Sequence, residues 1–281
     1  MGEEEFSRRA SITTDMFNYS FKLDMEAKLA LFADKGFRFI HWCDDWNNGV
    51  LYSGKDIEIY RQVVESCGLK CLDVHGSDAP GVKIGAQDDR ALGEFVRLLE
   101  NRIEFCSAIG GDAVVVHPPK DPSDYARSLK PLERVRPLCE ELGVVLAMEN
   151  CFPADDVLLA QYFQMFPPEF VGYCFDSGHA NVYGNTDTLM KFSDRLKVLH
   201  LHDNRGKEDD HQPPFYGTVD WPKVMRWIGQ SGYSKPVNFE VTHRPRYFEG
   251  TPNEYLDHVV ASIVKALSSG TADPTSHARQ A

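Results

Sequence analysis

The amino-acid sequence predicts a single (β/α)8 TIM barrel, on three observations. Short apolar runs recur along the chain, and each ends in a histidine or an acidic residue. These terminal residues are His41, His75, His117, Glu149, Asp176, His202 and Glu240. They are separated by 34, 42, 32, 27, 26 and 38 residues, which suits one strand and one helix per interval. The chain has 281 residues, and one such barrel needs roughly 250.

The apolar runs have the composition of strands that are buried on both faces of a parallel sheet. The first strand is expected near residues 12–15, and the later ones end at the residues named above. Residues 1–10 are charged and are expected to form a flexible N-terminus. Residues 11–268 are expected to form the barrel. Residues 269–281 lack an apolar pattern, which predicts a disordered tail.

Apolar residues at helical spacing, often followed by glycine, predict the intervening helices. The expected ranges are 25–36, 56–67, 88–109, 125–142, 155–165, 186–192, 221–229 and 253–267. Two longer segments interrupt the pattern: an aromatic, acidic loop over 41–54 and a polar loop over 203–220. Long loops inside a compact domain usually carry function, so both are expected at the active site.

Composition narrows the class of protein. The net charge of −12 argues against nucleic acid as the partner, because no global basic field attracts phosphates. Seven irregularly spaced cysteines fit reduced, buried thiols. No apolar stretch approaches the ~18 residues of a membrane span, and the start is acidic. These features indicate a soluble, cytoplasmic enzyme, and a homo-oligomer or a partner subunit stays open.

The C-terminal ends of barrel strands meet at one mouth, where active sites lie. Glu149, Asp176, His202 and Glu240 end strands five to eight and would meet there. Three carboxylates and one imidazole suit one divalent ion, with Mn²⁺ favoured and Mg²⁺, Co²⁺ or Zn²⁺ as alternatives. Two glutamates beside such an ion could remove and return a proton next to a carbonyl. The alternative is that each residue caps a helix or pairs with a cation.

The segment Asp176-Ser177-Gly178-His179 resembles the Asp-x-x-His motif of the xylose isomerase-like superfamily. Glu149-Asn150, the segment 200–204 and Asn238-Phe239-Glu240 are similar to it as well, and the resemblance covers about residues 10–267. That superfamily holds sugar isomerases, ketose 3-epimerases and the endonuclease IV group. The resemblance implies that Glu149, Asp176, His202 and Glu240 bind the metal. It implies further that Glu149 and Glu240 are the acid/base pair and that His179 binds a substrate hydroxyl.

Further residues are expected at the substrate. The family's epimerases carry an arginine six residues after the ligand histidine, whereas Arg205 comes three residues after His202. His75, His117, His211, Trp42 and Trp46 complete the expected substrate-binding set. His41 is as well explained by structure as by function, and His200 is expected to point into the barrel one layer deeper, packed and hydrogen-bonded. The segment His243-Arg244-Pro245-Arg246 either holds a phosphate or carboxylate of the substrate or is a solvated basic loop.

A three-metal arrangement is the main competing assignment, because the same residues resemble the ligands of endonuclease IV. In that arrangement His75, His117 and Glu149 hold one zinc ion, and Asp176, His202 and Glu240 hold a second. His179, Asp209 and His211 would hold a third. Three clustered metals suit attack on a phosphodiester. The acidic charge argues against a bound duplex.

We therefore expect a divalent-metal-dependent isomerase or epimerase of a sugar or keto-sugar. It would work through a metal-stabilised enediolate with the two glutamates as acid and base. One alternative is a metal-dependent lyase, or deglycosidase, that eliminates an aglycone from a 3-keto-glycoside, since it shares the metal and the base. The other is an endonuclease IV-like zinc phosphodiesterase. A barrel that serves only as a binding or partner subunit fits less well, because the four-ligand set is intact.

Overall fold

Eight parallel strands form the centre of the molecule in a computed structural model that describes residues 1–270. The strands are β1 (Ala10–Thr13), β2 (Phe39–Trp42), β3 (Lys70–His75), β4 (Ala113–Val116), β5 (Val145–Glu149), β6 (Val171–Asp176), β7 (Leu196–His200) and β8 (Val237–Phe239). Each pairs with its neighbour in sequence, and β1 also pairs with β8. The bridge between Leu201 and Phe239 joins the ends of β7 and β8. The Glu240 N–H donates to the Leu201 carbonyl at 3.0 Å, so the predicted barrel is confirmed.

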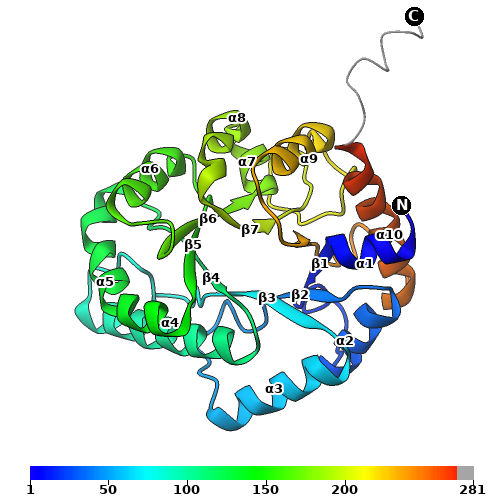
Figure 1. The fold of residues 1–281 in the computed structure, drawn as a ribbon. Coiled ribbons are helices and arrows are strands. Elements are labelled where there is room, and N and C mark those ends of the chain that lie inside the picture. Colours follow the sequence, from blue (N-terminus) through cyan, green and yellow to red (C-terminus); the bar gives the residue numbers. More distant parts are fainter. Residues whose placement is uncertain (271–281) are drawn as a thin grey trace, which may run out of the picture.

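Helices surround the strands, as Figure 1 shows. They are α1 (Glu3–Arg9), α2 (Met25–Asp34), α3 (Gly54–Ser66), α4 (Asp89–Ala108), α5 (Tyr125–Leu142), α6 (Asp155–Met165), α7 (Ser177–Tyr183), α8 (Thr186–Leu189), α9 (Trp221–Gln230) and α10 (Pro252–Ser269), with 3-10 helices η1 (Pro122–Asp124) and η2 (Met190–Arg195). The helices predicted over 125–142 and 155–165 have the expected bounds. The helix predicted over 186–192 is divided into α8 and η2, and Phe192 inside η2 has non-helical dihedral angles.

Side chains alternate between two cores along each strand. The larger core lies between strands and helices, and a small core inside the barrel consists of Ala113, Val115, Ala147, Cys174 and Val198. Two residues beyond members of this inner core come His117, Glu149, Asp176 and His200. The same periodicity that fills the barrel with small apolar groups therefore carries polar side chains to its mouth.

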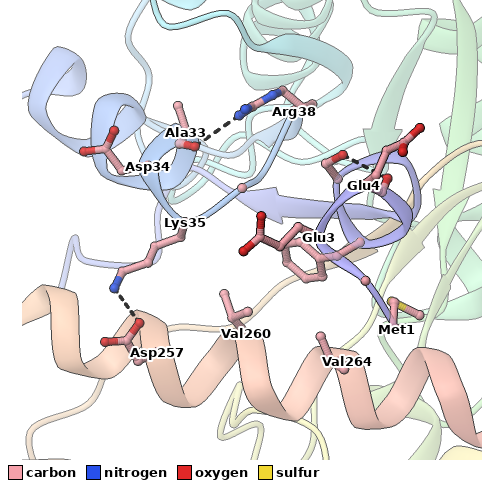
Figure 2. Close-up of a pocket in the computed structure, with 14 residues that line it drawn as sticks. Met1, Glu3, Glu4, Ala33, Asp34, Lys35, Arg38, Asp257, Val260 and Val264 are labelled. Atoms are coloured by element: carbon pink, nitrogen blue, oxygen red, sulfur yellow. Dashed lines mark hydrogen bonds and ion pairs between the residues drawn. The ribbon is translucent and has the colours of Figure 1, made fainter.

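The N-terminus differs from the expectation of a flexible segment, because residues 3–9 form α1. Phe6 is only 4% exposed, and its ring centroid lies 5.0 Å from that of Phe37. The Arg9 guanidinium donates to the Leu267 carbonyl in α10 at 3.2 Å. Figure 2 shows the groove between α1, the turn after α2 and α10, where Lys35 pairs with Asp257. One buried phenylalanine therefore orders a charged segment. The tail predicted over 269–281 lies outside the described residues from 271 onward.

Two expectations drawn from composition can be compared with the structure. All seven cysteines are free thiols, and six of them are buried. Among residues 1–270, no helix combines the length and the apolar character needed to cross a membrane.

Candidate metal and acid-base site

A cavity of about 240 Å³ lies at the C-terminal ends of the strands. Its lining residues are Asp15, Tyr19, Trp46, His75, His117, Glu149, His179, Asp209, His211, Glu240, Thr242 and Arg244. Eight of these were predicted as site residues from the sequence. Larger hollows of about 600 and 800 Å³ lie at the groove of Figure 2 and beside the loops that follow β3 and β4. Neither of these hollows is lined by histidine. The cavity at the barrel mouth combines histidines with carboxylates, so it is the candidate active site.

Glu149 and Glu240 both approach the same imidazole nitrogen. The His200 Nδ1 atom lies 3.3 Å from Glu149 Oε2 and 3.2 Å from Glu240 Oε2. Both carboxylates are buried, and His200 has no exposed surface. Burial lowers the pKa of His200, but Glu240 and Glu149 outweigh it and raise the pKa to about 9. The two carboxylates are thus held within two hydrogen-bond lengths of each other.

The two histidines of β7 and its extension contact different carboxylates. The His202 Nε2 atom is 3.2 Å from Asp176 Oδ2 and 3.5 Å from Asp209 Oδ1. Both imidazoles point into the barrel, because they are two residues apart on one strand direction. His200 is in register with Asp176 and reaches the glutamates from the deeper layer. His200 is buried, as the sequence predicts, and its polar contacts are with both glutamates.

Gly178 makes room for His202. A Cβ atom at this position would lie 1.9 Å from His202 Cε1, well inside contact distance. The Ser177 hydroxyl donates to the His202 carbonyl at 2.8 Å, so the histidine cannot move away freely. Gly178 therefore allows the His202 ring to pack against the first turn of α7.

We expect Gly178→Ala to destabilise the protein by about 1–3 kcal/mol and to displace His202 from Asp176, because the added methyl overpacks the site. Urea unfolding measures the first effect, and the NMR chemical shifts of the His202 ring measure the second. Gly93→Ala in α4 is the matched control: nothing lies within 4 Å of its Cβ position. In a helix interior this change stabilises by up to about 1 kcal/mol. Equal stability of the two variants would contradict the packing account.

A second group of donors surrounds Glu149. His117 Nε2 lies 3.3 Å and His75 Nε2 lies 3.7 Å from Glu149 Oε2. The His75 Nδ1–H donates to the Gly76 carbonyl at 2.7 Å, which leaves Nε2 with its lone pair toward the site. Burial, and then His117, lower the pKa of His75 well below its usual value. The ligand atoms of His75, His117 and Glu149 all lie within 4.8 Å of one another.

A third group centres on Asp209. Its Oδ2 atom lies 2.9 Å from His211 Nε2 and 3.4 Å from His179 Nε2. His211 has a φ of +49°, a left-handed conformation that few residues other than glycine adopt. Burial lowers the pKa of His211, but Asp209 outweighs it and raises the pKa to about 10. The rings of His202 and His211 stack with centroids 4.0 Å apart, which links this group to Asp176.

Two predicted substrate-binding residues lie away from the cavity. Trp42 is buried, donates to the Tyr52 hydroxyl at 3.2 Å and packs on Phe105 at 5.1 Å. It points to the helices because its neighbour His41 points into the barrel, where His41 Nδ1 lies 2.5 Å from Asp73 Oδ1. Arg205 is exposed and does not line the cavity. Neither residue therefore lines the cavity in which we expect the substrate.

Trp46 does line the cavity, with its ring centroid 5.1 Å from that of His75. Of the four further lining residues, Asp15, Tyr19 and Thr242 were not predicted as site residues, and for Arg244 the sequence left two alternatives open. They follow the ends of β1 and β8, so the rule that loops after barrel strands form the active site could have found them. Arg244 was expected either to bind substrate or to be solvated.

The donor set fits a divalent cation. Several buried atoms around the two glutamates have no hydrogen-bond partner: Glu149 Oε2, both ring nitrogens of His200, His179 Nδ1 and His202 Nδ1. Buried polar atoms without partners are costly and call for an explanation such as an ion. Carboxylate oxygens with imidazole nitrogens are the ligands that Mn²⁺, Co²⁺ and Zn²⁺ accept. Among the described residues, His200 is the imidazole that lies within 3.3 Å of both glutamates.

Known proteins share this architecture. Residues 29–265 match the family model described as xylose isomerase-like TIM barrel. The uncharacterized protein y4fM of Sinorhizobium fredii is 31% identical, over 87% of this chain and 90% of y4fM. A structure of L-ribulose 3-epimerase aligns with a TM-score of 0.74 and 17% identity, over 93% of this chain and 95% of that one. The IOLI protein with a binding zinc atom aligns with a TM-score of 0.73 and 18% identity, over 92% and 98%.

Proposed function

The chain belongs to the xylose isomerase-like TIM barrel family, and we propose that it is a divalent-metal-dependent isomerase or epimerase of a keto-sugar. One observation carries the proposal: two buried glutamates both lie within 3.3 Å of one imidazole nitrogen, His200 Nδ1, at the barrel mouth. The aligned structures include an epimerase and a protein with a binding zinc atom, which supports this choice. Manganese is the metal we propose first, and zinc is the closest alternative.

The two glutamates would carry out the proton transfer. One carboxylate removes the proton from the carbon beside the carbonyl, and the other returns it from the opposite side. Return to the same carbon gives epimerisation, and return to the neighbouring carbon gives isomerisation. Bound by Glu149, His200 and Glu240, a divalent cation would supply polarisation of the carbonyl and charge neutralisation. Burial of both carboxylates keeps water away from them, which strengthens these electrostatic effects.

The cavity supports a small substrate. Its volume of about 240 Å³ lies below the roughly 300–1,000 Å³ of pockets for drug-sized ligands. Ring nitrogens of His75, His117 and His179 face Glu149 and could orient hydroxyl groups. Trp46 forms one apolar wall. A monosaccharide fits these limits better than a large glycoside does. Trp42 is buried, so it adds no further aromatic surface for the aglycone of a glycoside.

Hydrogen exchange with solvent tests the proposal. The protein, stripped of metal and then reloaded with Mn²⁺ or Zn²⁺, is incubated with keto-sugars in D₂O and followed by proton NMR. Loss of the signal from the carbon beside the carbonyl, dependent on metal, supports the proposal. Absence of exchange from the metal-loaded protein across aldose–ketose and 3-epimer pairs would contradict it.

A phosphodiesterase with several zinc ions is the second candidate, and three donor groups favour it. The group of His75, His117 and Glu149 shares Glu149 with the proposed acid-base pair. The group of His179, Asp209 and His211 adjoins Asp176 through His202. Clustered metals of this kind suit in-line displacement at phosphorus.

The double variant Asp209→Asn with His211→Asn distinguishes the two candidates. If sugar chemistry at the glutamates is correct, metal-dependent hydrogen exchange should remain within about tenfold of the original protein, because the changes leave Glu149, His200 and Glu240 intact. Under the phosphodiesterase assignment, the variant loses a zinc ion and its hydrolysis of bis(p-nitrophenyl) phosphate. Loss of hydrogen exchange with retained diester hydrolysis would contradict both the sugar chemistry that needs only the glutamates and the zinc site at Asp209 and His211.

A further inference from the structure

The loop after β8 places an arginine in the wall of the catalytic cavity. Among the lining residues, Arg244 is the only lysine or arginine. Its guanidinium carbon lies 4.0 Å from the ring centroid of Tyr19, which also lines the cavity. Within residues 1–270, no carboxylate comes within ion-pair distance of Arg244. Its charge is thus held against an aromatic face and remains available to a ligand.

Arg246, two residues later, has a different environment. Its guanidinium lies 2.9 Å from Asp210 and 3.5 Å from Glu208, and it does not line the cavity. The basic segment 243–246 therefore divides into one arginine neutralised by carboxylates and one that faces the cavity. This difference makes Arg246 a matched control for Arg244.

The backbone around Arg244 is fixed by contacts on both sides. The His243 N–H donates to the Met16 carbonyl at 2.7 Å, and the His243 ring packs on Phe21 with centroids 4.8 Å apart. The Tyr255 hydroxyl donates to the Thr242 carbonyl at 3.0 Å. These contacts bring the loops after β1 and β8 together. A guanidinium on such a fixed segment loses little freedom on binding a ligand.

A second polar group in the same wall has no partner. Thr242 is only 3% exposed and lines the cavity, yet its hydroxyl oxygen makes no hydrogen bond. A buried hydroxyl without a partner is costly and is usually satisfied by a ligand or a water molecule. A guanidinium can only donate, and a hydroxyl can donate as well. The two groups together suit a ligand group that only accepts hydrogen bonds.

The remaining charged lining residues leave Arg244 without an ion-pair partner, which favours an anionic ligand at this subsite. Asp15, Glu149, Asp209 and Glu240 are acidic, and none pairs with Arg244. Asp15 instead accepts from the Thr13 hydroxyl at 2.6 Å. A neutral sugar would leave the guanidinium without a direct ion-pair partner. An anionic substrate would neutralise it, and charge-assisted hydrogen bonds to planar or tetrahedral oxyanions are the strongest that arginine makes.

Building on the proposed function, we propose that the substrate is an anionic keto-sugar, and that Arg244 and Thr242 bind its carboxylate or phosphate. The anionic group lies on a part of the substrate other than the reacting carbonyl, which belongs to the glutamates. Carboxylate and phosphate share the chemistry that the subsite recognises. Binding measurements with both kinds of sugar distinguish them.

Isothermal titration calorimetry of the metal-loaded protein with D-fructose, D-fructuronate and D-fructose 6-phosphate tests this proposal. At least one anionic sugar should bind about 10–100-fold more tightly than D-fructose. Arg244→Met should abolish this preference, and Arg246→Met should retain it. Thr242→Val should weaken anion binding by about 3–10-fold without loss of stability, because it replaces an unsatisfied hydroxyl by a methyl group. Metal content checks that each variant retains the catalytic centre.

Equal binding of the three sugars, failure of both anionic sugars to bind, or a preference that survives Arg244→Met would overturn the subsite. Hydrogen exchange in D₂O separates this result from failure of the proposed function. Exchange without an anion preference removes the subsite and leaves the function standing. An Arg244-dependent anion preference without exchange confirms the subsite and removes the isomerase or epimerase function.

Discussion

Glu149→Gln should lower the rate of hydrogen exchange between keto-sugar and solvent by about 10²–10⁴-fold, which is the usual contribution of a positioned acid or base. Glutamine fills the same volume but cannot accept the proton. The carboxylate is buried among His75, His117, His179 and His200. Removing its charge therefore also removes the counter-charge of these imidazoles.

The measurement is proton NMR in D₂O, with metal content and thermal unfolding recorded for each variant. Glu133→Gln, on the exposed face of α5, is the matched control and should exchange at the original rate. If Glu149→Gln retains metal and fold but still exchanges rapidly, Glu149 is not the base. Glu240→Gln then becomes the decisive comparison, because Glu240 is the only other carboxylate in contact with His200 among the described residues.

His200→Asn should lower the affinity for the divalent cation by about 100-fold or more, since loss of groups that merely orient ligands already costs 10–100-fold. His200 Nδ1 is the atom shared by Glu149 and Glu240. Asparagine retains polarity near that atom and limits the damage to packing. His202→Asn should have a much smaller effect on this affinity, because His202 contacts Asp176 and Asp209 instead.

Competition with a chromophoric chelator measures both affinities, and urea unfolding at neutral pH checks that both variants fold. The two histidines are equally buried and two residues apart, so each is a matched control for the other. A large loss of affinity in His202→Asn with none in His200→Asn would restore the assignment that the sequence suggested and contradict the one drawn from the structure.

The barrel could be predicted because its signals are local. Alternating apolar runs and helical periodicity repeat in every unit, and glycines such as Gly143 end helices with a left-handed φ. Helix α1 could not be predicted in this way. Its only buried residue is Phe6, and the partner Phe37 is remote in sequence. Helix α7 was not predicted either. It begins directly after Asp176, within the segment 176–179 that was interpreted only as a ligand motif.

The sequence predicts which strand ends carry the site residues, but it does not predict which of these residues contact one another. Side-chain alternation directs both His200 and His202 into the barrel, and the choice between them depends on how far each strand is staggered against its neighbours. That stagger includes the register shift between Tyr173 and Cys174, which no sequence pattern marks. Alternation alone would have excluded Trp42, since His41 already occupies the inward position. Arg244 needed the structure, because only three-dimensional contacts distinguish it from Arg246.

The number of metal ions per chain tests the central claim that one cation serves proton transfer between Glu149 and Glu240. The protein is purified without added metal or chelator and analysed by elemental analysis. The account predicts about one divalent ion per chain, most of it lost in His200→Asn. Two or three zinc ions per chain, retained in His200→Asn, would contradict it and favour phosphodiester chemistry.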